Sequence, residues 1–477
     1  MRNTLLAAGA LSLAAVSTVA ALSTAKVFGA TDHPTGAPVA PCTKSTGTPP
    51  PLAPTTASTI AQAYDCIYAH YFDAPHLDDR ALLVSAFAAF TQELNRRGID
   101  QPTATLPALT GRRDADISAF AAVYQRVIDR LPNDEATRQA VGEATIRGLV
   151  AGLHQNHIAW VRGAAYQLQV VTGMSVSGGN GPGASDPAAV APLFVKTVEA
   201  GGPAANAGIK AGDEITSING VTPFINGKLD EGVWNWIAYP EDGVPVRLAL
   251  HRPATGQTLN VTLTPHTQSG PPAGPSAPPS KVLDGDVGYV QLSGFFTGPT
   301  GGAADAVLTA INNMRKQATL RGIILDLRGN GGGSAEERAK LLGMLAHHKI
   351  TSYECDSQDH CTPNRTDDSM PLVGLPFVVL TDRDCASACD SFTSTVKDLH
   401  LGTIVGTRTA GVVAGIPSLF NLNDGSGLQL TTKYEVGADH ELINGVGVAP
   451  DQYAPVTAAS LSAGHDLGLE KALSLLH

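Results

Sequence analysis

The sequence lacks any surplus of positive charge and has only one long apolar run. Lysine and arginine together number 32, against 43 aspartates and glutamates, so the formal net charge is −11. This balance gives no general reason to expect binding to nucleic acid or to anionic membranes. Apart from residues 5–22, no stretch is long and apolar enough to cross a bilayer. The composition is that of a globular protein, and 477 residues predict roughly two to four domains.

The N-terminal 30 residues read as a secretory signal peptide. Arg2 precedes the apolar run, and small residues follow it, with Ala25 and Ala30 as possible cleavage sites. The competing interpretation is an uncleaved membrane anchor, because the run approaches spanning length. We expect cleavage, a secreted or cell-envelope location, and no stable membrane insertion afterwards. Residues 31–57 are rich in proline and threonine and predict a poorly ordered linker.

Six cysteines in an exported chain predict disulfides. Six cysteines allow fifteen pairings, and the sequence does not choose among them. The local pairs are Cys42 with Cys66, Cys355 with Cys361, and Cys385 with Cys389. The last pair brackets Ser387, and a disulfide there would fix the turn around that serine. A redox-sensitive enzyme is the alternative interpretation of cysteines at this place.

Two apolar runs end in segments suited to acyl chemistry. Residues 322–327 read as a buried strand, and the glycine-rich loop 329–333 follows it. Such a loop can present backbone N–H groups to an oxyanion, or it can simply form a tight turn. Residues 376–381 read as a second buried strand, and Ser387 follows between two alanines. A serine there can expose its hydroxyl at a helix N-terminus as a nucleophile, or it can be an ordinary N-cap.

These segments resemble the C-terminal processing (tail-specific) and tricorn-like serine proteases. The resemblance rests on four motifs in the family's order, which are DLRGNGGG at 326–333, CASACD at 385–390, GTRTAG at 406–411 and GVGVAPD at 445–451. Together with the regions described below, it covers most of the chain from about residue 58. It implies an α+β multidomain protein with a ClpP/crotonase-like α/β protease core at 281–477. The alternation of strands with helices after residue 281 independently predicts parallel strand pairing.

Two further regions precede the core. Residues 58–165 show helical periodicity and predict a helical N-terminal domain. Residues 166–267 change to short strands and turns, and GPAANAGIKAGDEITSING at 202–220 resembles a PDZ domain of the circularly permuted protease kind. That resemblance implies binding of peptide C-termini, with the terminal carboxylate held at Gly173, Met174 and Ser175. The alternative is a purely structural module; residues 268–280 read as a second linker.

The resemblance makes Ser387 the nucleophile, and the base depends on the branch of the family. The larger branch uses a lysine twenty-five positions after the serine, where this chain has Val412. Valine cannot accept a proton, which excludes a Ser–Lys dyad at that position, and we interpret Lys397 as a surface charge. The tricorn-like branch uses a histidine in an Asp-Gly-His-Thr-like turn. His157 lies in that place, although Gln155 stands where the aspartate is expected. The alternative interpretation of His157 is a helix-end histidine favoured by the dipole.

The remaining site residues follow from the same resemblance. Asn444 replaces the glutamate that completes the triad, and Glu441, three residues earlier, is the alternative partner of His157. The oxyanion hole is expected from the N–H groups of Gly332 and Ala388, with Gly331 as an alternative to Gly332. His154 and His157 have the spacing of metal ligands, but no third ligand is evident, so we expect no metal and no cofactor.

Two functions remain open at this point. The first is an exported serine endopeptidase that recognises unstructured protein C-termini through its PDZ domain. The second is a weakly active or inactive relative that binds peptides or small apolar ligands, because Val412, Asn444 and Gln155 depart from the family pattern. Retention of Ser387, His157 and the glycine loop favours the enzyme.

Overall fold

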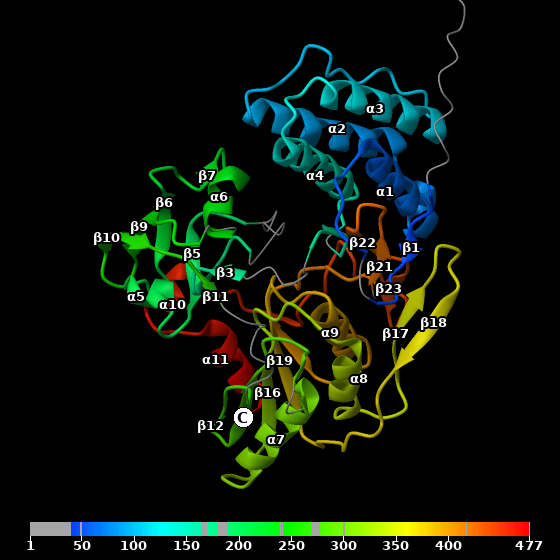
Figure 1. Cartoon of the computed structure of the whole chain (residues 1–477). Coiled ribbons are helices and arrows are strands. Elements are labelled where there is room, and N and C mark those ends of the chain that lie inside the picture. Colours follow the sequence, from blue (N-terminus) through cyan, green and yellow to red (C-terminus); the bar gives the residue numbers. More distant parts are fainter. Residues whose placement is uncertain are drawn as a thin grey trace, which may run out of the picture. The chain divides into compact units, whose positions relative to one another are not determined.

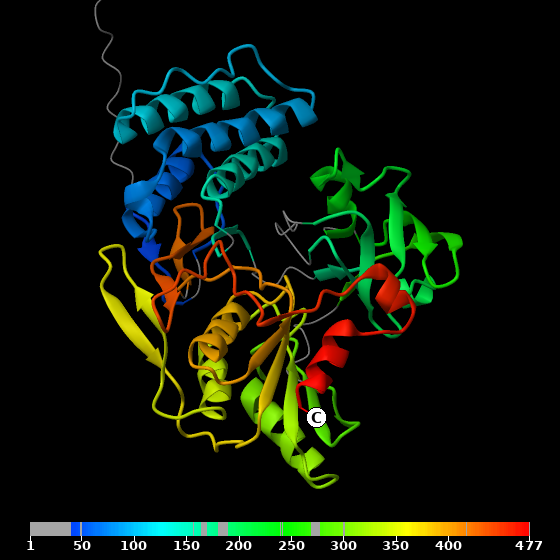
Figure 2. The same cartoon turned by 180° about the vertical axis from the view of Figure 1, so that it is seen from behind.

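A computed structural model describes residues 40–47, 50–155, 157–163, 169–179, 189–238, 240, 242–268, 277–298, 301–415 and 417–476. The expected signal peptide lies outside these residues, as do residues 31–39 and 48–49 of the expected first linker. Within the described part of the chain, no helix has the length and apolarity needed to span a membrane. Figures 1 and 2 show the chain from opposite sides.

The N-terminal region is helical, as the periodicity predicted. Its helices are α1 (Ala57–His70), α2 (Asp79–Arg96), α3 (Arg113–Ile128) and α4 (Glu135–Ala151), with a 3-10 turn η1 (Ala74–His76). Asp78 and Asp134 cap α2 and α4 by accepting backbone N–H groups. The apolar faces meet in a core that includes Phe90, Phe120 and Tyr124. A disulfide joins Cys42 to Cys66 of α1.

The PDZ-like region is built on a five-stranded antiparallel sheet. The order is β10-β9-β6-β5-β4, and the strands are β4 (Met174–Val176), β5 (Leu193–Val198), β6 (Glu214–Ile218), β9 (Val246–Arg252) and β10 (Gln257–Leu263). Helices α5 (Pro203–Asn206) and α6 (Glu231–Ala238) belong to the same region, and Trp234 of α6 is buried against the sheet. Short pairs flank it: β3 (Gln169–Val171) with β11 (His266–Gln268), and β7 (Phe224–Ile225) with β8 (Lys228–Leu229).

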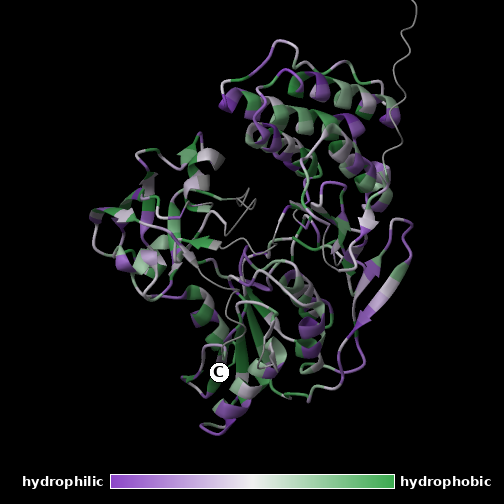
Figure 3. Cartoon of the chain, in the orientation of Figure 1, coloured by the Kyte–Doolittle hydropathy of each residue, from purple (hydrophilic) through white to green (hydrophobic). Residues whose placement is uncertain are grey.

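The C-terminal region contains a six-stranded sheet in the order β12-β13-β16-β19-β20-β24. The strands are β12 (Ser280–Leu283), β13 (Val287–Gln291), β16 (Gly322–Asp326), β19 (Phe377–Thr381), β20 (Thr403–Gly406) and β24 (Gln452–Tyr453). All neighbours except β12 and β13 pair in parallel, which confirms the prediction of a parallel α/β core. Every residue of β16 and β19 is buried, and the central strands are correspondingly hydrophobic in Figure 3.

Helices cover both faces of this sheet, which explains why its strands are continuous apolar runs. Ile323, Leu325 and Val379 face the core that contains α7 (Ala303–Arg315), α8 (Ala335–Gly343) and α9 (Ala388–Asp398). Alternate residues such as Ile324 and Val378 pack against α11 (Leu467–Ser474). The short helix α10 (Ala458–Ser462) and the pair β14 (Thr297–Gly298) with β15 (Gly301–Gly302) complete this region.

Two smaller sheets flank the core. One has the order β18-β17-β23 and contains β17 (Ile350–Cys355), β18 (Cys361–Arg365) and β23 (Tyr434–Gly437). The other has the order β1-β21-β22-β2 and contains β1 (Thr43–Lys44), β21 (Pro417–Asn421), β22 (Gly427–Thr431) and β2 (Ala159–Val161). Strand β2 follows the helical region and pairs antiparallel with β22 of the C-terminal region. This pairing brings the loop after α4 to the C-terminal region.

Candidate active site

Ser387 lies at a sharp turn between β19 and α9. It is the N-cap residue of α9 by position, and its backbone has φ 58° and ψ −118°. A non-glycine residue in this region is strained, and such strain persists only where surrounding contacts hold it. The Ser387 N–H donates to the Val412 carbonyl at 2.9 Å and to Asp390 Oδ2 at 3.0 Å. The turn therefore presents the Ser387 side chain at the carboxyl edge of the parallel sheet.

His157 lies in the loop between α4 and β2 and meets this serine. Its Nε2 lies 3.1 Å from Ser387 Oγ, although the two residues are 230 positions apart in the sequence. The Gln429 side chain of β22 donates to the His157 carbonyl at 3.1 Å, and the pairing of β2 with β22 holds the loop. Burial lowers the pKa of His157 below its ordinary value of 6.5, so the imidazole is neutral at pH 7. A neutral imidazole beside a serine hydroxyl is arranged as a general base.

Gln155 has a local role in the same loop. Its Oε1 accepts the His157 N–H at 2.9 Å. The glutamine that departs from the family pattern thus fixes the backbone of the histidine through a side-chain contact two residues away.

The structure does not bring Asn444 or Glu441 to His157 among its described contacts. Asn444 Oδ1 accepts the Val413 N–H at 3.1 Å. Glu441 lies with Ser394 and Asp398 of α9, and its Oε1 accepts the Ser394 hydroxyl. Burial and the neighbouring Glu441 carboxyl raise the pKa of Asp398 to about 7.

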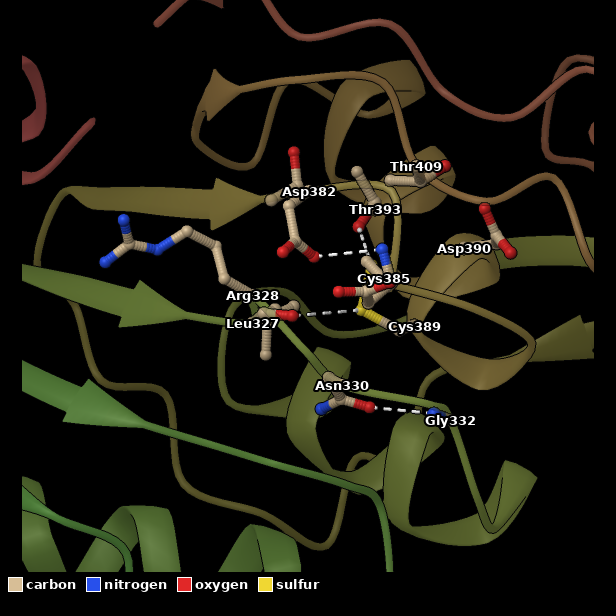
Figure 4. Close-up of a disulfide and its surroundings, with 12 residues drawn as sticks. Leu327, Arg328, Asn330, Gly332, Asp382, Cys385, Cys389, Asp390, Thr393 and Thr409 are labelled. Carbon is tan, nitrogen blue, oxygen red and sulfur yellow. Dashed lines mark hydrogen bonds between the residues drawn. A yellow bond between two sulfur atoms is a disulfide. The ribbon is translucent and has the colours of Figure 1, made fainter. Parts of the chain in front are cut away.

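The glycine loop approaches the nucleophile as expected, but its N–H groups are used differently. Gly332 packs so closely against the turn that carries Ser387 that a Cβ on Gly332 would come within 2.7 Å of Ser387 Cβ. Its N–H donates at 2.9 Å to Asn330 Oδ1 within the loop (Figure 4), so it is not directed at a substrate. Among the described residues, the N–H groups of Ala388 and Gly333 have no acceptor, and both residues line the cavity beside Ser387. Gly331 does not line that cavity.

Asp390 connects the serine to the next loop, a role that the sequence analysis did not assign. It is fully buried; Oδ1 accepts the Gly411 N–H at 2.9 Å, and Oδ2 accepts those of Val412 and Ser387 at 2.9 and 3.0 Å. Burial raises the pKa of Asp390, while the N–H donors and the Thr409 hydroxyl act in the opposite direction. Figure 4 shows Asp390 next to Thr409. The signal was present in the sequence, because an acid three residues after an N-cap serine is a capping-box pattern.

A cavity of about 420 Å³ opens next to Ser387 and His157. Its lining includes Arg338, whose guanidinium pairs with Glu435 at 2.7 Å in a buried ion pair. The Ser391 hydroxyl, one helical turn after Ser387, is buried in the same lining and has no hydrogen-bond partner among the described residues. The cavity is large enough for a substrate side chain beside the reacting carbonyl.

A second cavity, of about 630 Å³, lies on the PDZ-like region. Gly173, Met174 and Ser175, the residues expected to hold a peptide carboxylate, line it together with Trp234 and Ile237 of α6. Gly173 has φ 70°, and a Cβ there would come within 2.9 Å of the Pro203 ring, so this turn requires glycine. The groove lies along β4, the edge strand to which a peptide would be added.

Metal-ligand geometry occurs at one place in the described part of the chain. Cys42, Cys66 and His70 lie within 4.8 Å of one another. Both cysteines are in a disulfide, which leaves no thiolate to bind a metal ion. His154 and His157 do not form such a group with any third described residue.

Comparisons with known proteins agree with this architecture. Residues 286–454 match peptidase family S41, and residues 194–231 match a PDZ domain. A carboxyl-terminal-processing protease of Picosynechococcus sp. is 30% identical over 281 residues, covering 58% of this chain and 64% of that protein. Carboxyl-terminal-processing peptidase 2 of Arabidopsis thaliana, chloroplastic, is 33% identical over 290 residues, covering 60% and 54%. The chain thus spans less than two thirds of the length of these relatives.

Solved structures share the fold at lower identity. The photosystem II D1 C-terminal processing protease has a TM-score of 0.50 and 23% identity, covering 88% of this chain and 97% of that chain. Mature CPAF has a TM-score of 0.53 and 14% identity, covering 88% and 96%. These matches agree with the predicted mixed helix and sheet fold. By the family matches, residues 286–454 are similar to peptidase family S41 and residues 194–231 to a PDZ domain.

Proposed function

We propose that this protein is a serine endopeptidase that cleaves protein or peptide substrates through an acyl-enzyme and recognises their unstructured C-termini with its PDZ domain. The observation that carries the proposal is the 3.1 Å contact between Ser387 Oγ and His157 Nε2. It is supported by the peptidase family S41 match and by the carboxyl-terminal-processing relatives. No observation favours the non-catalytic alternative.

The chemistry follows from the positions of these groups. His157 accepts the hydroxyl proton as Ser387 attacks the substrate carbonyl, and later returns it to the leaving amine. The N–H groups of Ala388 and Gly333 stabilise the oxyanion, with Gly333 taking the role first expected of Gly332. Water then attacks the acyl-enzyme with His157 again as base. No metal or cofactor enters any of these steps.

The PDZ domain is proposed to deliver the substrate tail. A terminal carboxylate would bind at Gly173, Met174 and Ser175, and the tail would pair with β4. The neighbouring strand β5 carries Lys196, whose Nζ pairs with Asp382 at 3.0 Å and also with Asp384, in the loop before Ser387. This contact links the tail-binding sheet to the catalytic turn.

We also propose that the protein works outside the cytoplasm. This proposal is supported by the signal-peptide pattern expected at the N-terminus and by the three disulfides, since disulfides persist in oxidising compartments.

Degradation of an unstructured protein with an apolar C-terminus tests the proposal. The mature parent chain should degrade it, whereas Ser387→Ala should bind the tail without cleaving it. Equal degradation by parent and variant would overturn the assignment of Ser387. Tail binding by a parent that never cleaves would instead support a non-catalytic peptide-binding protein.

A further inference from the structure

The disulfide between Cys385 and Cys389 spans the nucleophile symmetrically, with Ser387 two residues from each cysteine. Both cysteines are fully buried. Figure 4 shows the disulfide between the end of β16 and α9. Cys389 Sγ lies 3.9 Å from the Leu327 carbonyl oxygen, and Cys385 Sγ lies 3.5 Å from Thr393 Oγ1. The disulfide is therefore packed in the interior next to the turn that carries Ser387.

The segment before Ser387 is fastened by loops. The Cys385 carbonyl accepts the Ala410 N–H at 2.9 Å, and the Ala386 N–H donates to the Asn330 carbonyl at 3.0 Å. These partners belong to the GTRTAG loop and to the glycine loop. None of these contacts reaches the body of α9.

The segment after Ser387 is fastened by helix packing. Phe392 and Val396 of α9 are fully buried in the core cluster of the protease domain. The peptide between Ser387 and Ala388 is consequently the joint between a loop-held segment and a helix-held segment. Ser387 has a positive φ at this joint. The disulfide crosses the joint as a second covalent connection besides the backbone, and the Ala386 carbonyl also accepts the Cys389 N–H across it at 3.0 Å.

A small rotation at the joint would misplace two catalytic groups together. It would turn the Ser387 hydroxyl relative to His157, and it would redirect the Ala388 N–H that is proposed to bind the oxyanion. Gly332 lies so close that a Cβ on it would come within 2.6 Å of the Ala386 carbonyl oxygen, so the surroundings are matched to one setting of this turn.

We propose that the Cys385–Cys389 disulfide is a positioning element for catalysis, which holds Ser387 and the Ala388 N–H in register with His157. The inference rests on the proposed serine peptidase function. It assigns to this disulfide a role that the other two do not have, because Cys355–Cys361 closes the β17–β18 hairpin and Cys42–Cys66 ties the N-terminal segment to α1.

The test compares the double variant Cys385→Ala/Cys389→Ala with the matched control Cys355→Ala/Cys361→Ala. A fluorophosphonate probe that labels reactive serines counts the active sites, so kcat is obtained per labelled site. We expect kcat and the rate of probe labelling to fall about 10- to 100-fold in the first variant, the range typical of a misplaced catalytic group. KM should change less than about twofold, the midpoint of the acid limb of the pH profile should stay unchanged, and the control should keep the parent kcat.

The outcomes separate the inference from the function on which it rests. A parent that neither cleaves nor reacts with the probe would defeat the proposed function itself. An active parent with an equally active double variant would overturn the positioning role alone. A double variant with fewer labelled sites but the parent kcat per site would show a structural role and would also overturn it.

If the alanine pair does not fold, Cys385→Ser/Cys389→Ser replaces it, because a hydroxyl at position 385 can bond the Thr393 hydroxyl. Failure of both pairs to fold would overturn the inference, since the disulfide would then be a requirement of the core.

Discussion

Replacing Asp390 by asparagine would test how the catalytic turn is held in place. Asp390 accepts three backbone N–H groups, from Ser387, Gly411 and Val412, at 2.9 to 3.0 Å. Asparagine has nearly the same shape but offers only one acceptor oxygen. Its best orientation keeps that oxygen on Ser387 and Val412 and turns the NH₂ group towards the Gly411 N–H.

The cost follows from this geometry. One buried N–H loses its acceptor and faces another donor, which costs about 1–3 kcal/mol in the free energy of unfolding. The tie between the serine turn and the loop at 411–412 also loosens. We expect kcat to fall about tenfold, since small misplacements of a catalytic group have effects of this order or larger.

The assay combines urea or thermal unfolding with kcat per fluorophosphonate-labelled site. Asp398→Asn is the matched control, because it is the same substitution on the same helix. Asp398 lies beside Glu441, so neutralising it removes a carboxylate repulsion and should not lower the unfolding midpoint at pH 8. An Asp390→Asn variant with the parent's midpoint and kcat would refute the reasoning about the turn.

Three further predictions concern charge. Since burial lowers the pKa of His157, kcat/KM should fall on acidification with a midpoint below pH 6.5. A midpoint clearly above pH 6.5 would argue against His157 as the base. The pKa of Asp398 is raised from 3.8 to about 7, so protonated Asp398 stabilises the folded protein. Its contribution to the free energy of unfolding is fully present below about pH 4 and is lost as the pH rises through 7. Asp398→Asn should flatten the dependence of the unfolding midpoint on pH between 4 and 8, and an unchanged slope would contradict this. Lys196→Met should lower kcat about 5- to 30-fold, which corresponds to a coupling of about 1–2 kcal/mol, while the affinity of the isolated tail peptide stays the same. A loss of tail affinity alone would show that Lys196 serves binding.

Local patterns predicted much of the fold. β16 and β19 were recognisable because each is an apolar run that ends in turn residues, and both are buried as that pattern implies. The helical region followed from its periodicity, and Ile60, Tyr64, Phe120 and Val127 are buried in it. The three disulfides join the local cysteine pairs, although the sequence alone left fifteen pairings open.

The contact between Ser387 and His157 had a different origin. Nothing in the spacing of residues 230 positions apart shows that they meet, and the expectation came from the resemblance of the surrounding motifs to a family. The pairing of β2 with β22 brings the histidine to the serine, and β2 is too short to predict from its own sequence.

Other features of the site depend on side-chain competition, which sequence patterns do not reveal. The Gly332 N–H was expected in the oxyanion hole, but Asn330 Oδ1, two residues away, accepts it. Glu441 was the alternative to Asn444 as the partner of His157, but it lies beside Asp398 and Ser394 of α9. In both cases a neighbouring side chain forms a hydrogen bond with the group that the motif had assigned to catalysis: Asn330 with the Gly332 N–H, and Ser394 with the Glu441 carboxylate.

The most direct test of the account measures substrate degradation by the mature parent, Ser387→Ala and His157→Ala side by side. The account predicts activity in the parent and loss of turnover in both variants, with tail binding retained in all three. Loss in Ser387→Ala together with full activity in His157→Ala would contradict it, because the proton acceptor would then be a group other than the imidazole beside the serine.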